Sequence, residues 1–432
     1  MTDDGVDVVR ESARAGRVVL WEESARDGAQ AKTLMSAEFR VRLALEQGRM
    51  FGPAGPRHVV FAAGFPAVCA EEREAVRRVA VETEGRVSVA AVCRGATADV
   101  RQALAAVRGV AHARVMVVVP ASEAMARVMV HRGAREALDA GVTLVRQDRD
   151  LDSAVAVDVC LADACRAEPA LVAAYATAMT EAGAGTVILA DTVGDQLPAQ
   201  VRSLFTAVRA EAAAEVVLAS HLHNDLGLGL ANTLEALRTG VRVVSSSWLG
   251  IAERSGMVAT EQLLFLLAQR TGALLGEATE PWWRAPDLTR MPGIARMVSE
   301  ETGVPLTVTT PIVGTGVGTI STGTPFVFPA LFQPFDPRAV LGTAPGVVLT
   351  QLASARVVRA VAAGLGHTLD EYQTKEAMGW VKARAYRQGA AVVDDASFAA
   401  YLDGLDARRP GAAPAVPAAP GAPAAVTADS AP

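Results

Sequence analysis

The chain has 432 residues, of which 51% are hydrophobic, 20% are charged and 5% are aromatic, and its formal net charge is −6. This composition is typical of a globular protein with a large aliphatic core and excludes a mainly disordered chain. The negative charge and the lack of a basic, aromatic-rich run argue against nucleic-acid binding. No apolar run is long enough to span a membrane.

Cysteine use and the first residues indicate the compartment. The four cysteines form no CxxC pair, so the sequence predicts reduced thiols rather than a disulfide framework or a thiolate zinc site. The opening stretch, "MTDDGVDVVRESARAG", lacks the apolar core of a signal peptide. These features predict a cytoplasmic protein.

Short runs rich in Val, Ile, Ala and Leu recur along the first 250 residues, with helical periodicity between them. The eight predicted strands are residues 17–24, 58–65, 87–93, 114–120, 154–161, 186–192, 216–223 and 241–250. Eight strands that alternate with helices favour an α/β fold of the (β/α)8 TIM-barrel type. An open doubly wound sheet is the alternative.

The alternation stops after about residue 275. A helix is expected at 294–303, a Gly/Thr-rich loop at 311–326 and further helix from about 345 to 389. The loop lacks the Gly-Lys-Ser/Thr ending of a P-loop, so it is predicted to be a lid segment rather than a phosphate cradle. The predicted domains are a catalytic barrel at 1–275, a mainly helical linker and lid region at 276–408, and a disordered Pro/Ala-rich tail at 409–432.

Two histidines stand one residue apart in "SHLHNDLGLGLAN", at the end of the seventh predicted strand. His221 and His223 share a face of that strand, and imidazole nitrogens bind divalent metals. Asp27, after the first strand, could add a carboxylate ligand. The structural alternatives are two hydrogen-bonded histidines at a strand end and a solvated ion pair of Arg26 with Asp27.

Polar residues also follow other predicted strands, and catalytic residues of TIM barrels gather at the carboxyl ends of strands. The residues concerned are Arg26 and Gln30 after the first strand, Arg94 after the third, Asp191 and Thr192 after the sixth, and Glu253 and Arg254 after the eighth. Each of them alone could be structural. Their recurrence at strand ends predicts a site at the mouth of the barrel.

Four motifs in this order, "RDGAQ", "DTVGDQLP", "HLHNDLGLGLANTLEAL" and "GIAERSG", resemble the signature of the DRE-TIM metallolyase superfamily. That superfamily includes the isopropylmalate, homocitrate and Re-citrate synthases and the HMG-CoA lyases. The resemblance covers about Val18 to Leu264. It extends more weakly through "MPGIARMVSEETGVPLTVTTPIVG", which is similar to the linker region of the synthases.

The resemblance implies a Claisen-type condensation of acetyl-CoA with a 2-oxo acid at a divalent metal, followed by hydrolysis of the thioester. The matching site residues are the metal ligands Asp27, His221 and His223, the charge-supporting Arg26, and the oxo-acid contacts Gln30, Arg94 and Thr192. Mn, Co, Zn, Mg and Fe all remain open as the metal. The family also implies a homodimer.

Several positions depart from the family pattern. Glu22 stands where an Asp is usual, and Met257 stands where the synthases have an Asn that is the fourth protein ligand. Ala62 and Ala162 replace glutamates, the second of which is assigned acid–base work. Pro325 replaces the lid histidine.

These losses leave the general base open. Glu253, His367 and Tyr372 are the candidates within the chain, beside a metal-bound water or an anionic group of the substrate. Of these, Glu253 is taken with Arg26 as the predicted catalytic pair.

The departures, with "LWEESARDGAQAKTLMS" and "GFPAVCAEEREAV", resemble a specialised branch of the superfamily. That branch makes 2-phosphinomethylmalate or 2-phosphonomethylmalate from acetyl-CoA and a phosphorus analogue of oxaloacetate, in antibiotic biosynthesis. A Re-type citrate, homocitrate or isopropylmalate-like synthase is the nearest alternative. A C–C lyase related to HMG-CoA lyase and a non-catalytic metabolite-binding protein remain as further alternatives.

Overall fold

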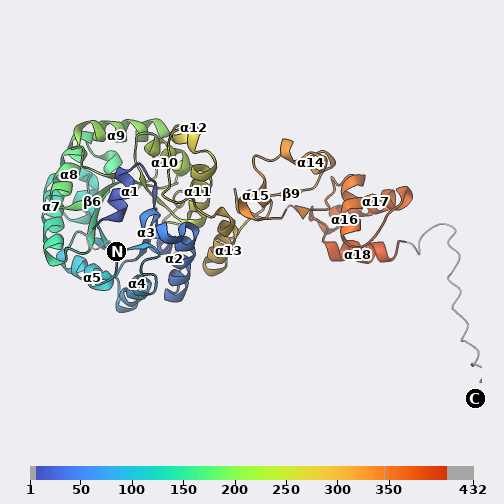
Figure 1. Ribbon diagram of the computed structural model, residues 1–432, viewed down its shortest axis with the longest axis horizontal. Helices are drawn as coiled ribbons and strands as arrows, with labels where there is room; N and C mark the ends of the chain where they lie inside the picture. Colours follow the sequence, from blue (N-terminus) through green and yellow to red (C-terminus); the bar gives the residue numbers. More distant parts are fainter. Residues whose placement is uncertain (1–5, 345, 406–432) are drawn as a thin grey trace, which may run out of the picture. The chain divides into compact units, whose positions relative to one another are not determined.

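The computed structural model describes residues 6–344 and 346–405, and its first part is a closed barrel of eight parallel strands (Figure 1). The strands are β1 Val19–Glu22, β2 Val59–Gly64, β3 Ser88–Arg94, β4 Arg114–Pro120, β5 Ala156–Ala162, β6 Ala184–Asp191, β7 Leu218–Leu222 and β8 Val243–Ser246. Each strand pairs with its neighbours in sequence, and β8 closes against β1. The closed barrel confirms the predicted TIM-barrel fold, and the alternative prediction, an open doubly wound sheet, is wrong.

Helices surround the barrel (Figure 1). They are α2 Ala37–Phe51, α3 Gly55–His58, α4 Ala70–Glu82, α5 Thr97–Val107, α6 Glu123–Met129, α7 Ala134–Leu151, α8 Pro169–Glu181, α9 Pro198–Glu211, α10 Gly229–Arg238 and α11 Thr260–Gln269. Local chemistry sets their starts: Ser36 accepts the amide hydrogen of Phe39 at the start of α2, and prolines open α8 and α9. In the described part of the chain, no helix is long and apolar enough to cross a membrane.

The barrel interior is filled by side chains from alternate positions of the strands, because successive residues of a strand point to opposite faces. Val19 and Trp21 of β1 and Ala219 of β7 belong to this buried apolar cluster. The same alternation places Glu23, just after β1, His221, on β7, and His223, just after β7, on the inner face. The aliphatic filling therefore gives way to charged and imidazole side chains at the carboxyl end of the barrel.

The amino-terminal end of the barrel is closed by α1 (Val8–Arg14), whose first two residues pack into the interior cluster. Asp7 caps α1 and lies 2.5 Å from Nη1 of the buried Arg114 on β4. Arg114 also donates from Nε and Nη2 to Asp158 on β5, at 2.8 and 2.7 Å. We call Asp7, Arg114 and Asp158 the floor cluster.

The segment after the barrel helices returns to pack on the barrel unit. It contains α12 (Thr271–Leu275), the short turn η5 (Leu288–Arg290) and α13 (Met291–Thr302). The apolar face of α13 is buried and contacts α2. This first compact unit comprises residues 6–317 and 339–343 of the described chain.

The second compact unit comprises the described residues of 318–338 and 344–405 and is mainly helical. Its helices are α14 Gly323–Val327, α16 Ala355–Gly364, α17 Glu371–Gln388 and α18 Asp395–Asp403, and a short parallel pair joins β9 Thr319–Ile320 to β10 Gly346–Val347. Helix α15 (Pro337–Leu341) lies where the two units meet in the sequence. The predicted tail at 409–432 lies outside the described residues.

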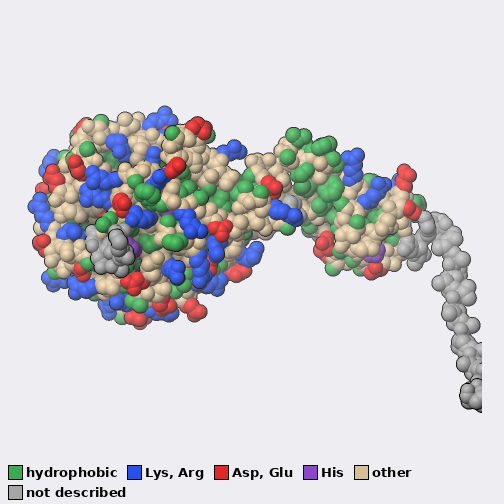
Figure 2. Space-filling model, in the orientation of Figure 1, with side chains coloured by type: hydrophobic (Ala, Val, Ile, Leu, Met, Phe, Trp, Pro, Cys, Tyr) green, Lys and Arg blue, Asp and Glu red, His purple; other side chains and the backbone are tan. Residues whose placement is uncertain are grey.

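The core of the second unit is built on α16, α17 and α18. Trp380 of α17 stacks on Tyr401 of α18 with ring centroids 4.4 Å apart. Exposed apolar side chains gather around α14, where Phe328 and Leu331 are 55% and 78% exposed (Figure 2). The helix predicted from about 345 to 389 is present as α16 and α17, which a turn between Gly364 and Glu371 separates.

Candidate active site

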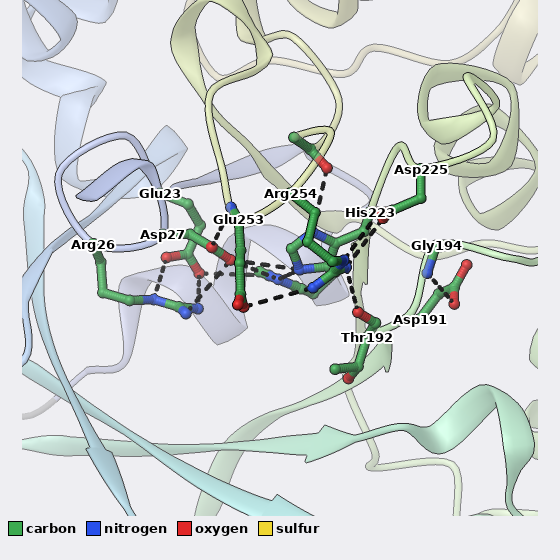
Figure 3. Close-up of polar contacts among 12 residues, drawn as sticks. Glu23, Arg26, Asp27, Asp191, Thr192, Gly194, His223, Asp225, Glu253 and Arg254 are labelled. Atoms are coloured by element: carbon green, nitrogen blue, oxygen red, sulfur yellow. Dashed lines mark hydrogen bonds and ion pairs between the residues drawn. The ribbon is translucent and has the colours of Figure 1, made fainter. Parts of the chain in front are cut away.

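The carboxyl ends of β1 and β7 bring one carboxylate and two imidazoles together (Figure 3). Asp27 Oδ2 lies 3.2 Å from His221 Nε2 and 3.6 Å from His223 Nε2. The two Nε2 atoms are 3.3 Å apart. All three side chains are buried, and their candidate ligand atoms lie within 4.8 Å of one another. No second group of this kind is found among the residues that the structure describes.

The surroundings of His223 and Asp27 favour the forms that bind a divalent cation, whereas for His221 burial would lower the pKa but hydrogen bonds to Asp27 and Glu23 raise it. His223 Nδ1 lies 3.2 Å from the Gly256 carbonyl, so Nδ1 carries the hydrogen and Nε2 keeps its lone pair. Burial lowers the pKa of His223 to about 4, which keeps its ring neutral at pH 7. Burial would raise the pKa of Asp27, but the charge of Arg26 and the hydrogen bond from His221 outweigh it and hold that pKa well below its usual range.

Neutral imidazole and ionised carboxylate are the forms in which these side chains bind metals. A set of two histidines and one carboxylate leaves coordination positions open for substrate or water. The donor chemistry, burial and convergence of Asp27, His221 and His223 therefore fit a divalent metal.

Arg26 lies beside the three candidate ligands and is held by a residue that the motifs do not single out. Its Nε and Nη2 donate to the two carboxylate oxygens of Glu23 at 2.8 and 3.0 Å, and its Nη1 lies 3.5 Å from Asp27 Oδ2. Burial would raise the pKa of Glu23, but Arg26 and His221 hold it below its usual value. The alternation of β1, which continues from Trp21 to position 23, is the signal that could have found Glu23.

Two of the residues expected to contact the oxo acid lie apart from this cluster. Gln30 is exposed on the short turn η1 (Gly28–Ala31). Arg94 has a side chain that is 65% exposed, and its Nε donates to Asp99 of α5 at 2.6 Å. Within the described residues, no polar contact joins either side chain to Asp27.

Thr192 and Glu253 lie closer to Asp27 and His223 (Figure 3). The Glu253 amide donates to Asp27 Oδ1 at 3.1 Å, while its exposed carboxylate lies 3.5 Å from Arg254 Nη1. Arg254 donates to the Thr192 carbonyl at 2.7 Å and forms a two-point ion pair with Asp225 at 2.9 and 3.0 Å. The Arg254–Asp225 pair therefore ties the loops after β6, β7 and β8 together at the mouth.

The positions that depart from the family pattern are buried around the barrel. Met257 is 1% exposed, and its backbone pairs with that of His223. Ala62 and Ala162 are buried on β2 and β5. Three further residues weighed in the sequence, Pro325, His367 and Tyr372, belong to the second unit.

A cavity of about 490 Å³ opens at the same end of the barrel, between the carboxyl ends of β3 and β4 and helices α6 and α7. Its walls are largely apolar, with Val119, Met129 and Leu144 among them. Its polar groups are Arg94, His131 and Arg132. A larger cavity of about 1510 Å³ lies at the opposite end beside α1, away from the candidate ligands.

The chain is similar in sequence to a known protein family and to individual enzymes. Residues 17–298 match the family model described as HMGL-like. The chain is 29% identical over 307 residues to the 2-isopropylmalate synthase of Neisseria gonorrhoeae, covering 70% of this chain and 49% of that protein. It is 33% identical over 259 residues to the 2-isopropylmalate synthase of Solidesulfovibrio magneticus, covering 59% of this chain and 48% of that protein.

The chain thus spans about half the length of these curated relatives. Among solved structures, the HMG-CoA lyase of Bacillus subtilis superposes with a TM-score of 0.54 at 21% identity, over 69% of this chain and 97% of that one. At this identity the likeness shows the fold alone.

Proposed function

The chain belongs to the HMGL-like family of DRE-TIM proteins, and from this premise we propose that it condenses acetyl-CoA with a 2-oxo acid. The reaction joins the acetyl methyl carbon to the ketone carbon, and hydrolysis of the thioester releases CoA and a 2-substituted malate. The observation that carries the proposal is the convergence of Asp27, His221 and His223 beside Arg26 in a buried barrel mouth. The synthase names of the relatives support the condensing direction.

Asp27, His221 and His223 would hold a divalent metal. When bound, the metal supplies Lewis-acid polarisation of the ketone and carboxylate oxygens of the oxo acid. The chain's own part is to keep these three side chains buried, with His223 neutral and Asp27 ionised, by the contacts described above.

Arg26 is proposed to stabilise the negative charge that develops during condensation. Two of its nitrogens are engaged by Glu23, so Nη1 is the nitrogen left to meet an enolate or alkoxide oxygen. A positioned cation is effective here because the site is buried and excludes most water. Glu253 is proposed as the proton acceptor for the acetyl methyl group, since its backbone is fixed to Asp27 and its carboxylate stays exposed at the mouth.

The cavity between β3, β4, α6 and α7 is proposed to take the CoA part of the donor. Its apolar walls suit a pantetheine arm, and Arg94, His131 and Arg132 suit phosphate groups. Gln30, Arg94 and Thr192 stay proposed contacts of the oxo acid. Arg94 lines the cavity at the end of β3, where it is placed to contact either the oxo acid or CoA.

We propose that the oxo acid carries a second anionic group, as phosphinopyruvate, phosphonopyruvate and oxaloacetate do. Ala62 and Ala162 remove two carboxylates from the barrel wall, which removes repulsion against such a group. A phosphorus analogue would place the enzyme in phosphinate or phosphonate antibiotic biosynthesis.

A thiol-release assay tests the proposal. Full-length protein with Mn²⁺ or Co²⁺ and acetyl-CoA is offered a panel of 2-oxo acids with apolar, carboxylate, phosphinate and phosphonate groups, and the product is identified by NMR. Free CoA should appear only with an oxo acid that carries a second anion. CoA release with 2-oxoisovalerate alone would overturn the substrate proposal. Failure with every acid would overturn the condensation itself.

A further inference from the structure

Glu23 directly follows β1, and neither the motifs nor the proposed function assigns it a role. Its side chain is fully buried on the inner face of the barrel. Its amide donates to the Ser246 carbonyl at 2.8 Å, which extends the pairing of β1 with β8 beyond Glu22. A carboxylate in such a place is unfavourable unless its oxygens are paired.

The backbone of Glu23 organises the turn that carries two site residues. Its carbonyl accepts the amide hydrogens of Arg26, Asp27 and Gly28, at 3.0, 2.8 and 3.1 Å. Three amides on one oxygen fix the start of this turn relative to the strand. The backbone of Glu23 therefore sets the positions of Arg26 and Asp27.

The side chain of Glu23 then fixes the direction of Arg26. Its two oxygens accept from Nε and Nη2 of the guanidinium at 2.8 and 3.0 Å, in the two-point geometry that makes arginine–carboxylate pairs strong and directional. The remaining terminal nitrogen, Nη1, lies on the side of Asp27. Without Glu23, the guanidinium would be free to rotate about its last bonds.

The same carboxylate lies against a proposed metal ligand. Glu23 Oε1 is 3.6 Å from His221 Nδ1, while His221 Nε2 lies 3.2 Å from Asp27. His221 Nδ1 is buried and has no hydrogen-bond partner nearer than this. Histidines that bind metals commonly direct their second ring nitrogen at a carboxylate, which fixes the tautomer and the ring orientation.

We propose that Glu23 is a positioning residue that orients both His221 and Arg26 toward the metal. The proposal rests on the metal centre of the proposed function. A purely structural role is the competing explanation, because any buried ion pair destabilises the fold when one partner is removed. Only a positioning role changes the affinity and ligand field of the metal in a protein that stays folded.

Cobalt titration of the metal-free, full-length protein separates the two roles without a substrate. The visible d–d absorption of Co²⁺ reports both the dissociation constant and the geometry of the ligands. We compare Glu23→Gln with the matched control Glu22→Gln, since Glu22 is the neighbouring residue, the last of β1, and its side chain is also fully buried. Glu22 faces away from the metal ligands and accepts from the Ser24 amide at 3.0 Å.

Glu23→Gln should weaken Co²⁺ binding by roughly 10- to 100-fold and change the absorption spectrum, the range seen when partners of metal ligands are replaced. Glu22→Gln should keep both within about twofold. If Glu23→Gln does not fold, Glu23→Asp decides: it keeps the charge but shortens the side chain, so the cobalt spectrum should still change.

Unchanged cobalt affinity and spectrum in a folded Glu23 variant would overturn the proposal, as would wild-type protein that binds no Co²⁺. Failure of the condensation reaction gives a different pattern. Wild-type protein would then bind Co²⁺, the Glu23 effect would persist, and no oxo acid would release CoA.

Discussion

The two ends of the barrel each hold a buried arginine between carboxylates, yet they differ in what remains unsatisfied. In the floor cluster, Nε, Nη1 and Nη2 of Arg114 all meet Asp7 or Asp158 within 3.2 Å, and the side chain is 2% exposed. At the mouth, Arg26 is 13% exposed and keeps Nη1 outside its hydrogen bonds. A buried ion pair alone therefore does not indicate a functional site. Such a site is indicated by polar atoms that converge on one point and are left outside hydrogen bonds within the fold.

Two buried histidines repeat this contrast. Burial lowers the pKa of both His58 and His223 to about 4. His58 uses both nitrogens within the fold, since Nδ1 donates to the Val18 carbonyl at 2.8 Å and Nε2 accepts from the Trp283 amide at 2.9 Å. His223 uses Nδ1 in the same way but directs Nε2 at His221 and Asp27. The depressed pKa is therefore common to a structural and a candidate functional histidine.

The largest expected effect is the loss of metal binding and condensation in His223→Ala. Removing one of three ligands removes several kcal/mol of charge stabilisation, or at least about 100-fold in kcat/KM. His58→Ala is the matched control, which should lose stability but still bind Co²⁺ where it is folded. Cobalt titration and the thiol-release assay measure both variants. Full activity of His223→Ala would contradict the proposed metal site.

Arg114→Met should reduce the free energy of unfolding by about 3–5 kcal/mol, because it leaves the carboxylate of Asp158 buried without its charge partner. The affinity of the folded protein for Co²⁺ should stay unchanged, since the floor cluster lies at the other end of the barrel. Urea unfolding at pH 7 measures the first quantity. If Arg114→Met lost affinity for Co²⁺ but kept the free energy of unfolding of the parent chain, the floor cluster would not be purely structural.

Arg26→Lys should lower kcat by roughly 10²- to 10³-fold, as expected when a donor to developing charge is removed. The positive charge stays, so Glu23 keeps a partner, but lysine has no planar group with two donors for it. Unfolding in urea should change less than in Arg114→Met. If stability falls as far as in Arg114→Met while kcat is kept, Arg26 is structural.

The smallest effect is a pH dependence of stability from His58. Its ordinary pKa of 6.5 falls to about 4 in the folded state, so between these values only the unfolded chain takes up the proton. The free energy of unfolding therefore falls as pH decreases from 6.5 toward 4, by roughly 3 kcal/mol in total. Above pH 6.5 this contribution is fully present.

The His58→Gln variant isolates this term from the carboxylates that titrate in the same range. Urea unfolding of both proteins at pH 7.5, 6 and 5 should give a smaller loss of stability in the variant than in the parent chain. Equal losses would show that His58 does not contribute.

Much of the fold followed from the sequence. All eight strands overlap their predicted ranges, because parallel strands buried on both faces form continuous Val, Ile, Leu and Ala runs that stand out from amphipathic helices. The last helix, α18 (Asp395–Asp403), was missed, since its 9 residues are too few for a clear helical periodicity of apolar positions.

The candidate site was only partly accessible from the sequence. Strand parity and strand ends located His221, His223 and Asp27, which the structure brings together. Arg94 stands at a strand end as well, but it turns to Asp99 of the following helix. The alternation of side chains along a strand cannot predict which residue Arg94 pairs with, because that pairing depends on the geometry of the loop after the strand. Glu23 was missed because a charged residue beside the motif looks solvated until the closure of β8 against β1 buries it.

The carbonyl of Glu23 also has a consequence for the motions of the site. Because the amides of Arg26, Asp27 and Gly28 share this one acceptor, a single local opening of the turn exposes all three to solvent. Their hydrogens should exchange with deuterium as one group, with a common rate that slows when metal binds Asp27. The arginine proposed to stabilise charge and the aspartate proposed to bind metal are thus ordered or released together.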